Sequence, residues 1–179
     1  MHFDLNLAGY QLRNAGRLVR GWKQELLHLA DLGTVSSLHG KIIRANGRVE
    51  NKGLLGRRVV TTAGVNYLAA CFTNTNEPEL FNFHDAGTGI VAEATTDTAL
   101  GTPWGGSRVS GTQSLPGSVN IYQTVATITF TGTFAITEHG IFSASTAGTL
   151  LDRTKFSALN VNNGDSIQFT YQITFNAGG

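Results

Sequence analysis

The stretch SIQFTYQITF, residues 166–175, alternates apolar and polar side chains without interruption. Successive side chains of a β-strand point to opposite sides, so the two kinds of residue fall on opposite faces. One face holds Ile167, Phe169, Tyr171, Ile173 and Phe175, and the other holds Gln168, Thr170, Gln172 and Thr174. The pattern predicts a strand with one face in a core and the other in water.

Similar segments precede this strand. IYQTVATITF, residues 121–130, alternates through Tyr122, Ala126, Ile128 and Phe130 and continues through Thr131-Gly132 into TFAITEHGIFSA. Gly148 precedes TLLDRTKFSALNV, and Asn163-Gly164 marks the turn into the last strand. Short strands with turn residues every 8–12 positions are typical of an antiparallel sandwich or barrel. We therefore predict an all-β fold, an antiparallel β-sandwich.

The composition agrees with one globular body. The chain has 179 residues, 22 of them glycine, and only 14% are charged. Its length suits one domain with an appendage. Cys71 is the single cysteine, which excludes an intramolecular disulfide and a Cys/His metal cluster. We expect no signal peptide or membrane helix, because the N-terminal residues contain no long apolar run.

Other elements are predicted from local signals. A helix is expected at about 61–73, where threonines able to cap it precede Val65, Leu68, Ala69 and Phe72. Asn46-Gly47 predicts a small hairpin in KIIRANGRVENKG. A short helix is expected over 17–31 in an otherwise extended segment, and residues 87–118 read as long loops with two strands near 107–114.

Charge is distributed unevenly along the chain. Residues 1–60 carry ten Lys and Arg against four Asp and Glu, whereas residues 61–179 carry three against eight. Together with the leucines of the first half, this predicts a basic N-terminal docking arm, 1–60, followed by the sandwich body, 61–179.

The arm is expected to bind protein more than nucleic acid. Arg13, Arg17, Arg20 and Lys23 recur at helical spacing and suit either phosphates or an acidic protein surface. The many leucines favour burial against a protein, so direct nucleic-acid contact is disfavoured. The predicted docking residues are Leu12, Arg13, Arg17, Leu18, Arg20, Trp22, Lys23, Leu26, Arg57 and Arg58.

Glu138 and His139 are the first candidates for chemistry. Adjacent residues in a strand point to opposite faces, so the two side chains do not converge as an acid–base pair requires. Ser143 or Ser145 would be the nucleophile of a hydrolase, but no G-x-S-x-G elbow surrounds either. Gly140 instead suggests a bulge or a close backbone approach, and we predict a structural role for the pair.

His84-Asp85 precedes the glycine-rich GTG and imitates a metal or phosphate site. Neither a complete phosphate-binding motif nor a metal-binding histidine spacing is present. We therefore expect no catalytic residues, no metal and no cofactor.

Six segments over residues 59–176 occur in a recognisable order: VVTTAGVNYLAACF, FHDAGTG, AEATTDTALGTP, RVSGTQS, NIYQTVATITFTGTFAITEHGIFSA and GTLLDRTKFSALNVNNGDSIQFTYQITF. This run resembles a module that recurs among virion structural proteins of tailed bacteriophages. Such proteins are described as structural proteins of unassigned role, as capsid decoration or cement proteins, or as tail-associated proteins. The resemblance implies a jelly-roll-like sandwich assembled as a trimer, with a terminal arm on neighbouring capsid subunits. It brings no catalytic residues, and the first 58 residues lie outside it.

The expected function is therefore that of a non-enzymatic cement or decoration protein, assembled in the host cytoplasm and located in the virion. Its expected partners are the phage major capsid protein and further copies of itself, with no membrane. Because the loops over 87–118 are rich in small residues, Leu100, Trp104, Val109 and Leu115 are predicted to bury against a neighbouring subunit.

Three other functions remain open. The first is a tail, neck or baseplate component, such as a fibre or an adaptor. The second is a glycan-binding receptor module, in which Trp104 and Tyr122 stack on sugars and Asp97, Asn120 or Asp165 supply polar contacts. The third is a hydrolase that acts through His139.

Overall fold

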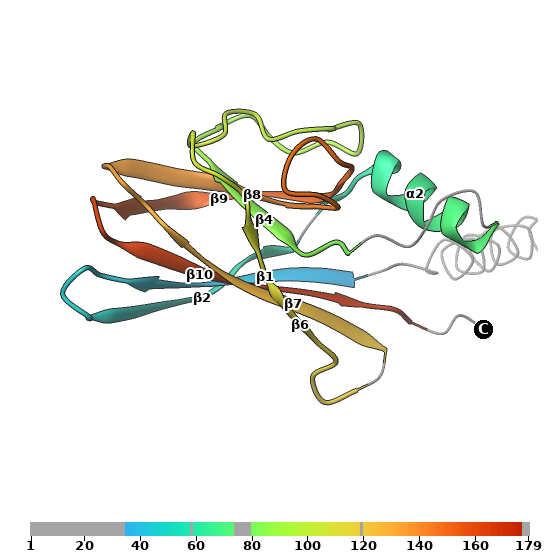
Figure 1. The fold of residues 1–179 in the computed structure, drawn as a ribbon, viewed down its shortest axis with the longest axis horizontal. Coiled ribbons are helices and arrows are strands. Elements are labelled where there is room, and N and C mark those ends of the chain that lie inside the picture. The colour runs from blue at the N-terminus through green and yellow to red at the C-terminus, as the bar shows by residue number, and fades with distance from the viewer. Residues whose placement is uncertain (1–34, 58, 74–79, 119, 177–179) are drawn as a thin grey trace, which may run out of the picture. The chain divides into compact units, whose positions relative to one another are not determined.

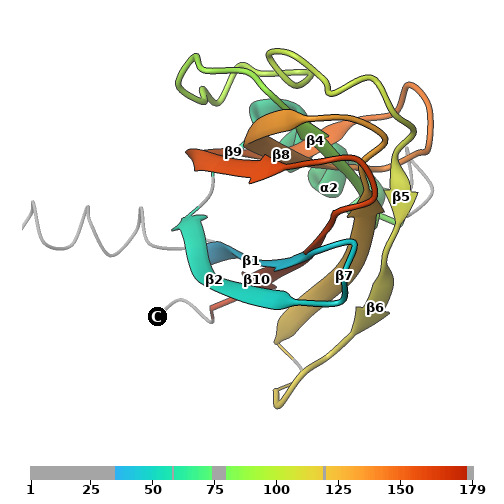
Figure 2. The same ribbon diagram turned by 90° about the vertical axis from the view of Figure 1, so that its left-hand side faces the viewer.

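The computed structural model describes residues 35–57, 59–73, 80–118 and 120–176, with no account of the side chain of Val59. Ten strands form two five-stranded sheets that face each other (Figures 1 and 2). Sheet A has the order β2-β1-β10-β7-β6 and sheet B the order β3-β9-β8-β4-β5. Every strand pair is antiparallel, so the predicted all-β sandwich is confirmed.

The elements follow the chain in this order: β1 (Val35–Ile43), β2 (Val49–Arg57), β3 (Val59–Val60), α2 (Thr62–Phe72), β4 (Phe83–Gly87), β5 (Val109–Ser110), β6 (Thr112–Ser114), β7 (Ile121–Thr129), β8 (Phe134–Phe142), β9 (Leu150–Val161) and β10 (Ser166–Thr174). Four consecutive strands fold across both layers. The outer pair, β7 and β10, is hydrogen-bonded in sheet A, and the inner pair, β8 and β9, in sheet B.

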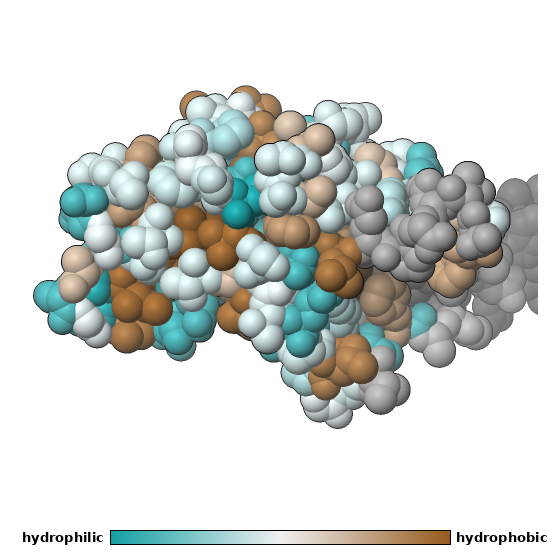
Figure 3. Space-filling model, in the orientation of Figure 1, coloured by the Kyte–Doolittle hydropathy of each residue, from teal (hydrophilic) through white to brown (hydrophobic). Residues whose placement is uncertain are grey.

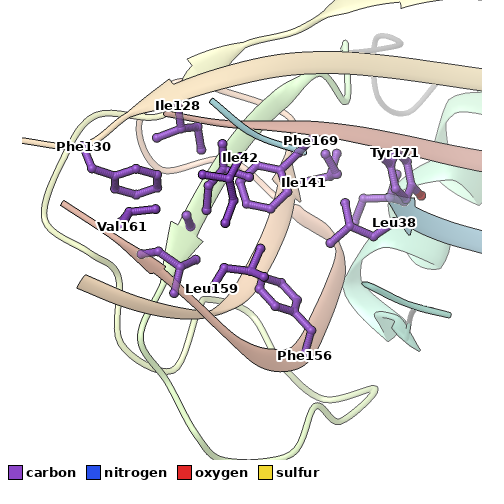
Figure 4. Close-up of a cluster of buried hydrophobic side chains, with 14 of the residues drawn as sticks. Leu38, Ile42, Ile128, Phe130, Ile141, Phe156, Leu159, Val161, Phe169 and Tyr171 are labelled. Atoms are coloured by element: carbon purple, nitrogen blue, oxygen red, sulfur yellow. The ribbon is translucent and has the colours of Figure 1, made fainter. Parts of the chain in front are cut away.

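The core lies between the sheets and follows the alternation of β10. Ile167, Phe169, Tyr171 and Ile173 are at most 1% exposed, which confirms their predicted inward face. Figure 4 shows Phe169 and Tyr171 packed among side chains from both layers, including Leu38, Ile141 and Leu159. Phe175, predicted on the same face, follows the end of β10 and is 46% exposed.

The predicted boundary between arm and body at residue 60 is wrong. β1 pairs with β10 along its whole length, from Val35↔Thr174 to Ile43↔Ser166, inside sheet A. Its inner face contributes Leu38 and Ile42 to the core. Sequence patterning missed this strand because glycine occupies an inward position, Gly40, where the Leu55 side chain takes the space that a Cβ would need. The body therefore begins at Val35.

The segment before Val35 carries much less net charge than residues 1–60 do. Six of the ten basic residues assigned to the arm lie within 35–60. Residues 1–34 keep four Lys and Arg against three Asp and Glu, so they are nearly neutral. They retain eight leucines and Trp22, which makes apolar character their main distinguishing property. The predicted helix over 17–31 falls outside the described residues.

The predicted hairpin at Asn46-Gly47 is confirmed, and it joins β1 to β2. Gly47 has φ of +84°, a conformation that glycine adopts readily. The Gly47 amide donates to the Arg44 carbonyl at 2.8 Å, and the Arg44 amide donates to the Arg48 carbonyl at 2.8 Å.

The helix predicted at about 61–73 is confirmed as α2, but of its predicted apolar face only Leu68 packs against the core. Gly64 is the buried position, and a Cβ there would lie 2.8 Å from the Leu151 Cα of β9. Val65 and Phe72 are 52% and 93% exposed. The close approach of backbone to backbone at Gly64 therefore sets the rotation of the helix, in place of the bulkier apolar side chains.

Thr61 caps this helix and anchors it to sheet B. Its hydroxyl accepts a hydrogen bond from the Gly64 amide at 3.0 Å and donates to the buried Leu150 carbonyl. Thr61→Ala is expected to lower the free energy of unfolding by about 1–2 kcal/mol, the usual loss for a removed N-cap. Urea unfolding measures the loss, with the neighbouring exposed Thr62→Ala as the control. Equal losses in the two variants would contradict this role.

Candidate functional site

Glu138 and His139 are both fully buried, at 0% exposure, yet they do not meet. β8 has a register irregularity between Ile136 and Glu138, whereas Gly140, where a bulge or a close backbone approach was predicted, pairs regularly with Arg153 and is surrounded by side chains. Glu138 lies on the outer face of sheet B under the long β4–β5 connection, whereas the His139 ring packs on Phe169 of sheet A, with ring centroids 4.4 Å apart. The two side chains therefore occupy separate environments and form no acid–base pair.

The Glu138 carboxylate is held by the backbone of the connection that covers it. Oε1 accepts from the amides of Gly89 at 3.0 Å and Thr102 at 2.7 Å, and Oε2 accepts from the amide of Gly101 at 3.0 Å. A Cβ on Gly89 would lie 2.4 Å from Oε1, so the backbone approaches more closely than a side chain would permit. We name residues 88–102 the Glu138 cap.

Arg153 of β9 completes this site as the counter-ion. Its Nη2 lies 2.7 Å from Glu138 Oε2, and its Nη1 lies 2.7 Å from Asp97 Oδ2 in the cap. Nη2 also donates to the Val91 carbonyl at 3.2 Å. The guanidinium thus ties the sheet to both ends of the cap, and its donors point at protein groups.

The electrostatics of the site keep these groups ionised. Burial by itself raises the pKa of Glu138, but the amides of Thr102 and Gly101 and the Arg153 guanidinium outweigh it and hold the pKa of Glu138 below its usual range. Burial likewise opposes ionisation of Arg153, yet Asp97 and Glu138 raise the net pKa of Arg153. The arrangement stabilises a loop, and the carboxylate has no lone pair directed at an open space.

His84 and Asp85 also separate to opposite faces. His84 Nδ1 lies 3.0 Å from His139 Nε2, and His84 Nε2 lies 3.1 Å from the Thr124 hydroxyl of sheet A. Asp85 faces outward, where its Oδ2 lies 3.5 Å from Arg108 Nε. Burial is the main cause that raises the pKa of Asp85. Among the described residues, no group of three or more His, Cys, Asp and Glu is placed to hold a metal ion.

Sequence reasoning missed a second buried carboxylate, Asp152 of β9. It is 0% exposed and accepts a hydrogen bond from the Ser36 hydroxyl at 3.0 Å, with the Tyr171 hydroxyl at 3.5 Å. The period-two position of Asp152 between Leu150 and Thr154 was the available signal. Its neighbours across the sandwich come from β1 and β10, which are distant in sequence.

The residues proposed for a hydrolase or a glycan site are engaged elsewhere. The Ser143 hydroxyl accepts from the Thr149 amide at 2.9 Å, within the β8–β9 turn. The ring of Trp104 packs edge-on against Phe130, with centroids 4.9 Å apart, and the Tyr122 hydroxyl donates to the Phe81 carbonyl at 2.9 Å. Asp97 and Asp165 pair with Arg153 and Arg44. The proposed sugar-binding residues are therefore divided among separate internal contacts.

The predicted interface residues have different outcomes. Leu100 is only 6% exposed and packs with Phe142 and Leu150 of its own subunit, so its prediction as an interface residue is wrong. Trp104 and Val109 are half-buried against the body's own core. Leu115 is 60% exposed and remains available.

Most predicted docking residues lie outside the described residues, namely Leu12, Arg13, Arg17, Leu18, Arg20, Trp22, Lys23, Leu26 and Arg58. Arg57 is exposed at the end of β2. Exposed large apolar residues elsewhere, such as Leu54, Phe72 and Ile90, come from different elements. On the face drawn in Figure 3, hydrophobic residues form several groups separated by hydrophilic ones.

A shallow depression lies beside the β1–β2 and β9–β10 turns. Its lining consists of Arg44, Ala45, Asn46, Arg48, Asn160, Asn162, Asn163 and Asp165. Arg44 bonds Glu50 at 2.8 Å and Asp165 at 2.9 Å, and hydrogen bonds from Arg44 and Lys52 keep the pKa of Glu50 well below its usual range. These charges join the two turns to each other and leave Arg48, whose side chain is 69% exposed, as the more accessible cation.

Comparisons with protein-family models, curated proteins and solved structures found no match for this chain. Within the described residues, no helix is both long and apolar enough to cross a bilayer.

Proposed function

We propose that the protein is a non-enzymatic structural protein of a tailed-phage virion, a cement or decoration protein that binds across major capsid subunits. The proposal rests on the motif resemblance over residues 59–176. The folded-over pairing of β7–β10 and β8–β9 across two sheets supports its jelly-roll-like description.

One structural observation carries the proposal further. Among the described residues, the main core draws its buried side chains from Leu38 to Ile173, and the sequence of residues 1–34 adds eight leucines and Trp22. Apolar side chains in such number are stabilised by burial against another surface. We assign that surface to the capsid and assign Leu12, Leu18, Trp22 and Leu26 to contact it.

The structure also changes the expected kind of contact. Because residues 1–34 are nearly neutral, binding depends on apolar burial more than on their arginines. A trimer would present three such segments together, and simultaneous attachment raises overall affinity without any new contact. Crosslinking neighbouring capsid subunits in this way increases the cost of separating them.

Two full-length variants test the proposal against each other. Leu18→Ser, Trp22→Ser and Leu26→Ser together are expected to weaken binding to capsids assembled without this protein by tenfold or more, since each buried apolar side chain contributes roughly 1.5–3 kcal/mol. Arg13→Gln, Arg17→Gln and Arg20→Gln together are expected to weaken it less than the apolar triple. Unchanged affinity of the apolar variant, with an unaltered circular dichroism spectrum, would overturn the docking role.

The position of the protein on the particle distinguishes a capsid protein from a tail, neck or baseplate protein. Imaging of intact particles that carry a labelled copy is expected to show the protein over the whole shell. A position at a single vertex would assign it to the tail, neck or baseplate instead, and monomeric protein in solution and on the shell would contradict the trimer.

A further inference from the structure

Two core histidines of sheet B form a hydrogen-bonded pair, and a contact from His84 to Thr124 links this pair to sheet A. His139 Nε2 and His84 Nδ1 are 3.0 Å apart, and the opposite nitrogen of His84 lies 3.1 Å from Thr124 Oγ1. His84, His139 and Thr124 are all 0% exposed. The polar contact therefore lies wholly inside the sandwich, between β8, β4 and β7.

A contact of this kind holds one hydrogen between the two rings. Two neutral imidazoles share a single N–H···N bond when one facing nitrogen carries the hydrogen and the other its lone pair. A singly protonated pair still places one hydrogen between the facing nitrogens. When both rings are protonated, two N–H donors face each other at 3.0 Å, and no acceptor remains between them. A second proton therefore breaks the bond and sets like charges against each other.

The surrounding inner layer compensates at most one positive charge. By strand register, the titratable groups nearest the pair are Asp152 of β9, two positions from Thr154 opposite His139, Tyr171 of β10, opposite Thr124, and Tyr122 of β7, two positions from Thr124. Asp85 and Glu138 lie on the other face of sheet B with Arg108 and Arg153. One carboxylate can balance the charge of only one imidazolium. Burying the charge of the second imidazolium without a counter-ion costs several kcal/mol.

The pair lies where the chain crosses between the sheets. Gly111 joins β5 of sheet B to β6 of sheet A, and a Cβ on it would lie 2.8 Å from His84 Nε2 and 2.2 Å from Thr124 Oγ1. The backbone of this crossing therefore covers the histidine–threonine contact directly. Separation of the rings displaces the segment that holds this edge of both sheets.

We infer that His84 and His139 form a proton-operated latch: the folded body accepts at most one proton on the pair, and a second proton opens the sandwich at the β5–β6 crossing. The inference concerns the body alone and is independent of the proposed role in the virion. The pair is therefore expected to make the folded body less stable in acid. The stabilisation is present at neutral pH and is lost as the pH falls below about 6.5, the ordinary pKa of an unfolded histidine.

Unfolding of the full-length protein as a function of pH tests the latch. Between pH 6 and pH 5 the unfolded chain approaches two bound protons at these histidines while the folded chain holds at most one, so the unfolding constant is expected to rise about sixfold or more. A double variant, His84→Gln with His139→Gln, keeps an amide pair that does not titrate. It is expected to lose this rise, whereas His39→Gln, at an exposed position on β1, is expected to keep it.

A second measurement needs no variant. Nitrogen NMR of the imidazole rings at pH 7 to 5 reports the protonation of each histidine in the folded protein. The His84–His139 pair is expected to gain no more than one proton over this range. Two imidazolium rings at these positions in protein that stays folded at pH 5 would overturn the latch, and so would an unchanged pH dependence in a double variant that folds.

Discussion

Glu138→Ala is expected to lower the free energy of unfolding by about 4 kcal/mol, close to a thousandfold in the unfolding constant, because it leaves a buried guanidinium without its main partner. Arg153 is 2% exposed and would keep only Asp97 as a carboxylate partner. The amides of Gly89, Gly101 and Thr102 would lose their acceptor at the same time. Urea unfolding with a two-state fit measures the change.

Glu50→Gln is the matched control for this prediction. Glu50 also has several cationic partners: Arg48 and Lys52, whose side chains are 69% and 34% exposed, and the half-buried Arg44, at 21%. Exposed pairs of this kind contribute about 0–1 kcal/mol, and added salt screens them. A loss at Glu138 no larger than the loss at Glu50 would show that the cap is held by something other than the carboxylate. Accelerated proteolysis within residues 88–102 of Glu138→Ala would locate the change.

Phe169→Ala is expected to cost about 3–5 kcal/mol, because the ring fills the centre of the space between the sheets. Phe169 is 0% exposed, stacks on His139 at 4.4 Å between centroids and lies 6.3 Å from the Phe156 ring. Removal of the Phe169 ring opens a cavity beside the His84–His139 pair, which loses the apolar side chain that packs against it. The thermal midpoint should fall by about 6–20 °C at this size of protein.

Phe72→Ala controls for the loss of a phenyl ring in general. Phe72 is 93% exposed on α2, so its replacement is expected to change the free energy of unfolding by less than about 0.5 kcal/mol. Similar losses at positions 72 and 169 would contradict the described core. Unaltered stability of Phe72→Ala alongside weakened self-association would instead assign the outer face of α2 to an oligomer contact.

Local patterning succeeded where one strand carries its own amphipathic signal. The alternation of β10, the turn at Asn46-Gly47 and the cap at Thr61 each depend on residues within a few positions of one another. It failed at β1, where Gly40 interrupts the apolar series because Leu55 of the neighbouring strand fills that space. It failed also for α2, where Gly64 decides which side meets β9.

At the candidate site, too, some features were predictable from the sequence and others were not. That adjacent residues such as Glu138 and His139 point apart follows from strand geometry alone, and the prediction was made on that ground. Their partners were not predictable, because Arg153 and His84 reach them from other strands and backbone amides reach Glu138 from the cap. The same holds for Asp152, whose hydrogen-bond donor Ser36 is 116 positions away in the chain.

The amino-acid sequence by itself determined that this protein is an antiparallel β-sandwich with a capped helix, since period-two burial and turn chemistry are local properties of the chain. Only the tertiary structure decided that the body begins at Val35, that Leu100 is internal, and that two histidines of neighbouring strands in sheet B pair inside the core. Those outcomes depend on which distant residues fill a given volume, and close packing is a property of the assembled sheets, which no single strand contains.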